Sequence, residues 1–210
     1  MLRILIADDH AVVRQGLRHI LAEIPEVGEV GEASDGQDAL NQVRAEAWDV
    51  LVLDMSMPGR GGLDILKDVR RERPNTRVLV LSMHPEDQFA VRMLKAGASG
   101  YLTKESAPDE LVKAVRKVMT GGKYVSATLA EKLAFDVEAD SDRPRHEKLS
   151  DREFQVMRQL AAGRSVQEIA EELVLSPKTI STYRARVLEK LDLKTNAELI
   201  HYAIGNKLVE

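Results

Sequence analysis

The chain has 210 residues, 44% hydrophobic and 30% charged, so it can bury a core and is not compositionally disordered. A net charge of -4 and a pI near 5.8 exclude a globally basic nucleic-acid binder, so any such binding must come from a local patch. The absence of cysteine excludes disulfides and thiolate metal sites, and no apolar run approaches the ~20 residues of a membrane span. With no signal-peptide core either, we expect a cytoplasmic globular protein with no membrane partner.

Short apolar runs alternate with helical patterns up to about residue 120. The predicted strands are 2–7, 28–33, 50–53, 77–81 and 100–102. The predicted helices are 10–23, 36–46, 62–72, 86–95 and 108–120. Continuous Val, Ile and Leu runs are typical of parallel strands that are covered on both faces. Residues 1–120 are therefore predicted to form an α/β domain with a five-stranded, doubly wound parallel sheet.

Residues 121–147 are predicted to be a short helix and a linker. A helical pattern from Leu129 to Phe135 follows Gly121-Gly122, and residues 136–147 are polar and acidic without periodicity. This composition predicts a domain boundary.

Residues 148–210 are predicted to form a second, all-α domain of four helices. Capping-box patterns at Ser150–Glu153, Ser165–Glu168 and Thr195–Glu198 mark three helix starts. Ser176 before Pro177 marks the fourth, because a hydroxyl caps the helix and proline at its first position loses no hydrogen bond. The second and third helices are a helix-turn-helix candidate.

Polar residues follow four of the predicted strands: Asp8 and Asp9, Asp54, Ser82 and Lys104. In open α/β sheets, ligands bind outside the carboxyl ends of the strands, where strand order reverses. One isolated Asp at a strand end is more often a helix N-cap, but four coincidences in order favour a site. Three carboxylates, a hydroxyl and an ammonium suit a divalent cation and a phosphoryl group.

The two halves of the chain resemble two known domains. The acidic residues, with Met57-Pro58-Gly59 and Tyr101-Leu-Thr-Lys104, resemble the flavodoxin-like receiver domain of bacterial two-component response regulators. The C-terminal segments Leu149–Glu153, Leu175–Ile180 and Glu189–Leu191 resemble the LuxR-type helix-turn-helix. In this order, the pair resembles the NarL/FixJ class of transcription regulators.

The resemblance implies that Asp54 accepts a phosphoryl group from a sensor histidine kinase. Carboxylates of Asp8, Asp9 and Asp54 suit Mg²⁺, and the resemblance adds the backbone carbonyl of Ser56 as a ligand. It further implies that Lys104 and Ser82 contact phosphoryl oxygens, that Tyr101 rotates from an exposed to a buried position, and that residues 89–107 form the output surface.

The predicted helix from Pro177 to Leu191 is the DNA-binding candidate. Residues 147–210 carry equal numbers of basic and acidic side chains, but this helix has a local basic excess that could neutralise phosphates. Alone, a charged face is more often a solvated surface. Helical spacing turns Ile180, Val187 and Leu191 inward. The predicted DNA contacts are Lys178, Thr179, Ser181, Thr182, Arg184, Ala185, Arg186 and Lys190, and the resemblance assigns base contact to Ser181, Thr182 and Ala185.

The last predicted helix carries an apolar stripe of Leu199, Ile200, Ala203 and Ile204. About half of the stripe could be core, and the family uses this helix for dimer contact on DNA. A homodimer would place two recognition helices about one DNA turn apart and predicts a pseudo-palindromic operator.

We therefore expect a phosphorylation-dependent regulator rather than an enzyme. An aspartyl-phosphate phosphatase is an alternative, but it typically needs a second Asp two residues after the nucleophile, where Ser56 stands. A binding module that is never phosphorylated is another, and a degraded acidic site would mark it. The histidines, His10 among them, have no metal-ligand spacing, and we predict ordinary surface or helix-face roles for them.

Overall fold

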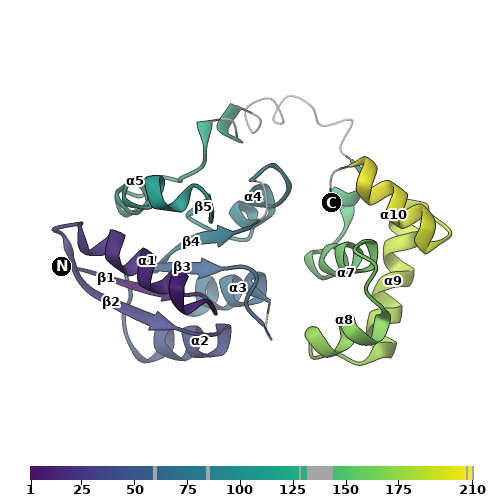
Figure 1. Ribbon diagram of the computed structural model, residues 1–210, viewed down its shortest axis with the longest axis horizontal. Helices are drawn as coiled ribbons and strands as arrows, with labels where there is room; N and C mark the ends of the chain where they lie inside the picture. The colour runs from purple at the N-terminus through teal and green to yellow at the C-terminus, as the bar shows by residue number, and fades with distance from the viewer. Residues whose placement is uncertain (59–60, 84–85, 128, 132–143, 207, 210) are drawn as a thin grey trace. The chain divides into compact units, whose positions relative to one another are not determined.

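The apolar runs of the first half form five parallel strands. They are β1 (Leu2–Ala7), β2 (Val27–Ala33), β3 (Val50–Asp54), β4 (Arg77–Ser82) and β5 (Gly100–Thr103). Their order in the sheet is β2-β1-β3-β4-β5, which confirms the predicted doubly wound topology (Figure 1). The order reverses between β1 and β3, so their carboxyl ends lie side by side.

This computed structural model describes residues 1–58, 61–83, 86–127, 129–131, 144–206 and 208–209. The chain divides into two compact units, Met1–Ala134 and Phe135–Glu210. In the described part of the chain, no helix has the length and apolar character needed to cross a membrane.

Five helices cover both faces of the sheet. They are α1 (Ala11–Ala22), α2 (Gly36–Ala45), α3 (Gly62–Glu72), α4 (Glu86–Lys95) and α5 (Ala107–Met119). Leu17 of α1 and Leu111 of α5 share one buried cluster with the sheet. Leu40 of α2 and Ile65 of α3 belong to the cluster on the other face, where each fully buried side chain of this size contributes about 1.5–3 kcal/mol.

Strand β2 departs from the predicted pattern of complete burial. It lies at the edge of the sheet, and Glu29 is exposed and paired with Arg3, with 2.7 Å between Oε2 and Nε. Gly31 of β2 lies against the indole of Trp48, because a Cβ at this position would be 2.5 Å from Cη2. The edge position therefore explains why β2 carries charged residues and glycines instead of a continuous apolar run.

The chain that leaves α5 returns to the free side of β5. Tyr101 N donates to Tyr124 O (3.0 Å) and Tyr124 N to Ser99 O (3.0 Å), which is parallel strand pairing. Gly100 makes this approach possible, since a Cβ there would be 2.7 Å from Tyr124 O. Residues 129–131 are helical, and Leu129 is buried in the cluster that holds Tyr101. The rest of the predicted short helix and most of the predicted linker lie outside the described residues.

The second unit contains a short 3-10 turn and four helices. They are η1 (Arg145–Lys148), α7 (Asp151–Ala161), α8 (Val166–Glu172), α9 (Pro177–Leu191) and α10 (Asn196–Gly205). Complete capping boxes begin α7 and α8, and Ser176 caps α9 by accepting from Thr179 N (3.1 Å), as predicted. The third predicted box is half formed: Thr195 accepts from Glu198 N, but the Glu198 carboxylate accepts from Lys194 N instead.

A strained turn joins α8 to α9. Val174 has φ 54°, and its side chain is exposed. A β-branched residue is an outlier in this left-handed region, because its Cβ crowds the backbone. The turn is closed by Leu175 N donating to Ala170 O (2.8 Å), so surrounding contacts hold Val174 in its unfavourable conformation.

Candidate functional site

The predicted polar residues at the carboxyl ends of the strands meet in one acidic pocket. Asp8 follows β1 and Asp54 ends β3, and both carboxylates are completely buried. Asp9 is partly exposed at the rim. Lys104 reaches them from the end of β5. Topology therefore brings together residues almost 100 positions apart.

Lys104 holds the two buried carboxylates. Its Nζ lies 3.0 Å from Asp54 Oδ2 and 2.7 Å from Asp8 Oδ2, and its side chain is only 11% exposed. The other oxygen of Asp54 accepts from the backbone N–H of Ser56 (3.1 Å). The Asp54 carboxylate is thus fixed from two sides, with one ammonium shared between two negative charges.

Burial dominates the electrostatics of the pocket. It raises the pKa of Asp54, against the opposing effect of the hydrogen bonds from Lys104 and Ser56. Burial alone would lower the pKa of Lys104, but its hydrogen bonds to Asp8 and Asp54 outweigh burial and raise it. Lys104 is therefore cationic at neutral pH, and the pocket retains an excess of negative charge.

The pocket fits a hard divalent cation. Ligand atoms of Asp8, Asp9, His10 and Asp54 lie within 4.8 Å of one another. Asp8 Oδ2 is buried and lies 2.7 Å from the Lys104 ammonium. Carboxylate oxygens grouped in this way are the ligand type that Mg²⁺ prefers.

His10 belongs to this pocket, although no pattern of histidine spacing predicted it. Its Nδ1 lies 3.0 Å from Asp9 Oδ1 and 3.2 Å from Asp8 Oδ1, while the ring is 63% exposed. The prediction of an ordinary surface role missed these contacts. The signal available in the sequence was adjacency to Asp8-Asp9.

Ser82 ends β4 and Tyr101 lies in β5, and both are 1% exposed. Ser82 O accepts from Lys104 N (2.8 Å), which ties the end of β4 to the residue that holds the carboxylates. Tyr101 packs in the same cluster as Met93 of α4 and Leu129. In this structure Tyr101 therefore occupies the buried one of its two predicted positions.

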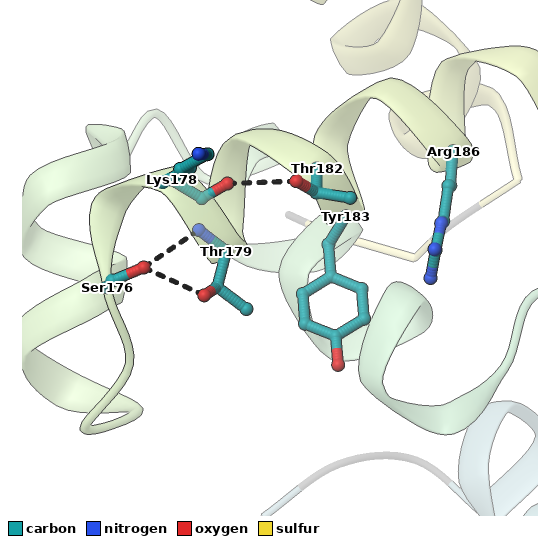
Figure 2. A pocket seen from close by; sticks show the side chains of 6 residues that line it. All are labelled: Ser176, Lys178, Thr179, Thr182, Tyr183 and Arg186. Atoms are coloured by element: carbon teal, nitrogen blue, oxygen red, sulfur yellow. Dashed lines mark hydrogen bonds between the residues drawn. The ribbon is translucent and has the colours of Figure 1, made fainter.

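Helix α9 presents the second candidate site. Lys178, Ser181, Thr182 and Ala185 are all exposed, while Ile180, Val187 and Leu191 are fully buried, as the helical spacing predicted. Figure 2 shows the Tyr183 ring and the Arg186 side chain extending from α9 in the same direction. They help to line a hollow of about 350 Å³, with Ser176, Lys178, Thr179 and Thr182. Tyr183 was not among the predicted DNA contacts.

The predicted cations of α9 fall into two groups. Arg184 Nε donates to Asn196 Oδ1 (2.7 Å), and Lys190 Nζ pairs with Glu153 Oε2 (2.6 Å). Both side chains therefore contact residues of other helices in the domain, and their DNA contact stays a prediction. Lys178 and Arg186 form no ion pair with any described residue and line the hollow. The two groups are indistinguishable in the sequence because their partners lie on other helices.

The apolar stripe of α10 is only partly available for dimer contact. Leu199 and Ala203 are completely buried in the domain, which removes them from the predicted interface because their side chains already pack inside. Ile200 is partly buried, and Ile204 is 55% exposed. About half of the stripe is therefore core, as the sequence allowed, and dimer contact through Ile200 and Ile204 stays a prediction.

Comparison with known proteins matches both halves of the chain. Residues 4–116 match the family described as response regulator receiver domain, and residues 147–203 match bacterial regulatory proteins of the luxR family. The response regulator UvrY of Escherichia coli strain K12 is 40% identical over 209 residues, covering 99% of this chain and 96% of UvrY. The response regulator GacA of Pseudomonas aeruginosa is 37% identical over 212 residues, covering 100% and 99%.

A solved structure is also similar. RcsB from Salmonella enterica serovar Typhimurium, bound to the promoter rprA in the presence of the phosphomimetic BeF3-, gives a TM-score of 0.72 at 31% identity. The match covers 96% of this chain and 97% of RcsB.

Proposed function

The chain belongs to the response regulators that join a receiver domain to a LuxR-type helix-turn-helix, which are phosphorylation-dependent DNA-binding transcription regulators, and we propose that Asp54 is its phosphoacceptor. One observation carries this proposal: Asp54 is the buried carboxylate to which both Lys104 Nζ and the Ser56 N–H donate hydrogen bonds. Asp8 shares Lys104, but its other oxygen, Oδ1, already accepts from the backbone N–H of His10 (2.8 Å).

The proposed reaction is a phosphoryl transfer to the Asp54 carboxylate. An oxygen of Asp54 attacks the phosphorus of a kinase phosphohistidine, a P–O bond forms, and the P–N bond breaks. The imidazole leaves and takes a proton from solvent. Lys104 is placed to pair with a phosphoryl oxygen, because its ammonium already lies at Asp54 Oδ2.

Asp8, Asp9 and Asp54 would hold Mg²⁺, with the backbone carbonyl of Ser56 as a further ligand. When bound, the ion supplies positive charge that neutralises the phosphoryl oxygens. His10 contacts both Asp8 and Asp9, so it would orient these carboxylates as they turn toward the metal.

The output path would run from Lys104 and Ser82 to Tyr101. A phosphoryl group on Asp54 would draw Lys104 away from Asp8 and give Ser82 a new hydrogen-bond acceptor. Lys104 N is bonded to Ser82 O, so movement of one loop is felt in the other. The two positions of Tyr101 then form a two-state element that the new charge biases.

The proposed DNA contacts are now divided by role. Ser181, Thr182 and Ala185 would face base edges in the major groove, and Lys178, Thr179 and Arg186 would contact phosphates. The Thr182 hydroxyl donates to Lys178 O (3.0 Å), so toward DNA it would act as a hydrogen-bond acceptor. The promoter-bound RcsB structure, similar over nearly the whole chain, supports this use of α9.

Ile200 and Ile204 on α10 are the proposed dimer contacts, and a homodimer would read two half-sites of one operator. Exposure of Ile204 supports this role. A regulator that takes its signal from a kinase and acts on promoter DNA would work in the cytoplasm.

Replacement of Asp54 tests the phosphoacceptor directly. Asp54→Asn should abolish labelling by a small phosphodonor such as acetyl phosphate in the presence of Mg²⁺, measured by intact-protein mass. Asp109→Asn, an exposed carboxylate in the first turn of α5, is the matched control and should label normally. Undiminished labelling of Asp54→Asn would remove Asp54 from its role.

A double replacement tests base contact. Thr182→Ala with Ala185→Arg should change which operator sequence is preferred, because both positions are exposed on the outer face of α9. Selection from a random DNA library would report the preference. An unchanged preferred sequence would contradict the assignment.

A further inference from the structure

A second polar cavity lies at the amino ends of the strands, opposite the acidic pocket. It has a volume of about 170 Å³. Its lining comes from the end of α3, the start of β4, the residues before β5 and the turn after α5, and consists of Arg70, Arg77, Gly97, Ser99, Gly121, Gly122 and Lys123. Neither the phosphoacceptor site nor the DNA-binding helix uses these residues.

Three cations converge on this cavity without an anionic partner. Arg70, Arg77 and Lys123 form no ion pair with any carboxylate of the described ranges, and they donate to backbone carbonyls instead. These contacts are Arg70 Nη1 to Pro74 O (2.6 Å), Arg77 Nη1 to Asn75 O (2.7 Å) and Lys123 Nζ to Ala98 O. A carbonyl dipole orients a cation but leaves its charge uncompensated. Burial and the nearby Arg70 charge lower the pKa of Lys123, in keeping with that excess.

Ser99 adds a neutral donor to the same cavity. The residue is 6% exposed and lines the cavity, so its hydroxyl can donate to a group bound there. Gly97 shapes the wall: it has φ 106°, and a Cβ would lie 3.0 Å from Arg70 Cγ, so glycine lets the arginine lie across the loop.

We propose that this cavity binds a phosphate group, either free phosphate or the phosphate of a nucleotide. Guanidinium groups recognise phosphate oxygens with paired N–H donors, and the ammonium and hydroxyl supply donors from other sides. The cavity is smaller than the roughly 300–1,000 Å³ of pockets for drug-sized ligands, so only a small anionic group enters it. A bound phosphate would join Lys123, at the start of the inter-domain segment, to α3 and β4.

Titration of the full chain with inorganic phosphate tests the site. Amide resonances of Gly97, Ser99 and Gly122 should shift saturably in two-dimensional NMR at constant ionic strength, without Mg²⁺. Lys123→Gln and Arg77→Gln should each weaken binding about fivefold or more, because a charge-assisted hydrogen bond is lost at a partly solvated site. Lys113→Gln, an exposed lysine on α5 outside the cavity, is the matched control and should bind as the parent does.

Adenosine monophosphate distinguishes the two sources. Equal affinity for both ligands would assign the site to free phosphate, and at least tenfold tighter binding of the nucleotide would assign it to nucleotides. Shifts that do not saturate by about 10 mM, a concentration far above a millimolar dissociation constant, would overturn the proposal. Shifts of the same size in Lys123→Gln, Arg77→Gln and the parent would also overturn it.

Discussion

The acidic pocket and the outer face of α9 differ in how far their functional groups are buried and in how many elements supply them. The pocket buries Asp8 and Asp54 completely and assembles its groups from strands far apart in the chain. The α9 face exposes its groups and takes them from one helix. A group that must hold a metal beside a phosphoryl group gains strength from low dielectric, whereas a group that must find DNA has to remain in solvent.

The difference sets where each site is vulnerable. A lost charge in the pocket leaves another charge buried and unpaired, so a substitution there affects stability as well as function. Removal of a charge from the exposed α9 face leaves no buried partner unpaired. A substitution there therefore affects DNA binding alone. The following predictions test this contrast, from the largest expected effect to the smallest.

Removal of the pocket cation should have the largest effect. Lys104→Gln leaves Asp8 and Asp54 buried without a counter-charge, and we expect the free energy of unfolding to fall by about 3 kcal/mol in EDTA. Excess Mg²⁺ should recover part of the lost stability, because the carboxylates that Lys104 no longer neutralises would bind the metal in the folded state. Urea unfolding measures both, and Lys113→Gln on α5 should change neither. A loss below about 1 kcal/mol would show that burial does not govern the pocket.

The capping box of α7 is the nearest equivalent in the second domain. Glu153→Gln loses the charge that accepts from Ser150 N and pairs with Lys190, and should lower the unfolding free energy by about 1–2 kcal/mol at pH 7. Burial raises the pKa of Glu153, but hydrogen bonds from Lys190 and Ser150 outweigh burial, so the pKa lies below its ordinary value of 4.5.

The sign of the pH effect follows. A carboxylate with a depressed folded pKa contributes stability above its unfolded pKa, and that contribution is lost as pH falls through the folded value. The stability difference between the parent and Glu153→Gln should therefore be constant near neutrality and shrink below about pH 4.5. Thermal unfolding across this range checks it, and a difference independent of pH would contradict the ion pair.

Arginine and lysine replacements on α9 should separate its two groups of cations. Arg186→Gln should weaken DNA binding by about 1 kcal/mol for all sequences and lower the slope of log affinity against log salt by about one, as expected for one phosphate contact. Lys190→Gln should leave the slope unchanged, because Glu153 already holds this side chain. Fluorescence anisotropy at several salt concentrations gives both slopes. Equal slopes for the two variants would contradict the division of the α9 cations into two groups.

Relief of the strained turn should have the smallest effect. Val174→Asn should raise the unfolding free energy by about 0.5 kcal/mol, because asparagine tolerates the left-handed conformation that valine resists. Val174→Ala keeps the Cβ in that conformation and is the control. A similar gain from alanine would show that exposure of the valine side chain, and not backbone strain, limits stability.

Much of the fold and the pocket could be predicted from sequence because strand ends are local signals. Asp8, Asp54 and Lys104 follow apolar runs directly, and parallel topology then brings them to one edge. His10 escaped prediction because its contacts depend on how its ring turns back over its neighbours. Ion pairs between helices, such as that of Lys190 with Glu153, depend on how helices pack, and spacing along one helix holds no information about them.

The same limit applies to the α10 stripe and to the basic cavity. Helical period groups Leu199 with Ile204 but does not say which edge of the stripe faces the core. Arg70, Arg77 and Lys123 are separated by whole elements, and only the sheet brings them together.

The pairing of Tyr124 with β5 has a practical consequence for anyone who isolates the first domain. A fragment that stops at residue 120 would leave the outer edge of β5 uncovered and remove Leu129 from its packing against the Tyr101 cluster. Such a fragment would be prone to self-association through the exposed edge of β5. Its Tyr101 would take a position that reflects the truncation and not the intact chain. A faithful receiver fragment has to extend through at least residue 131.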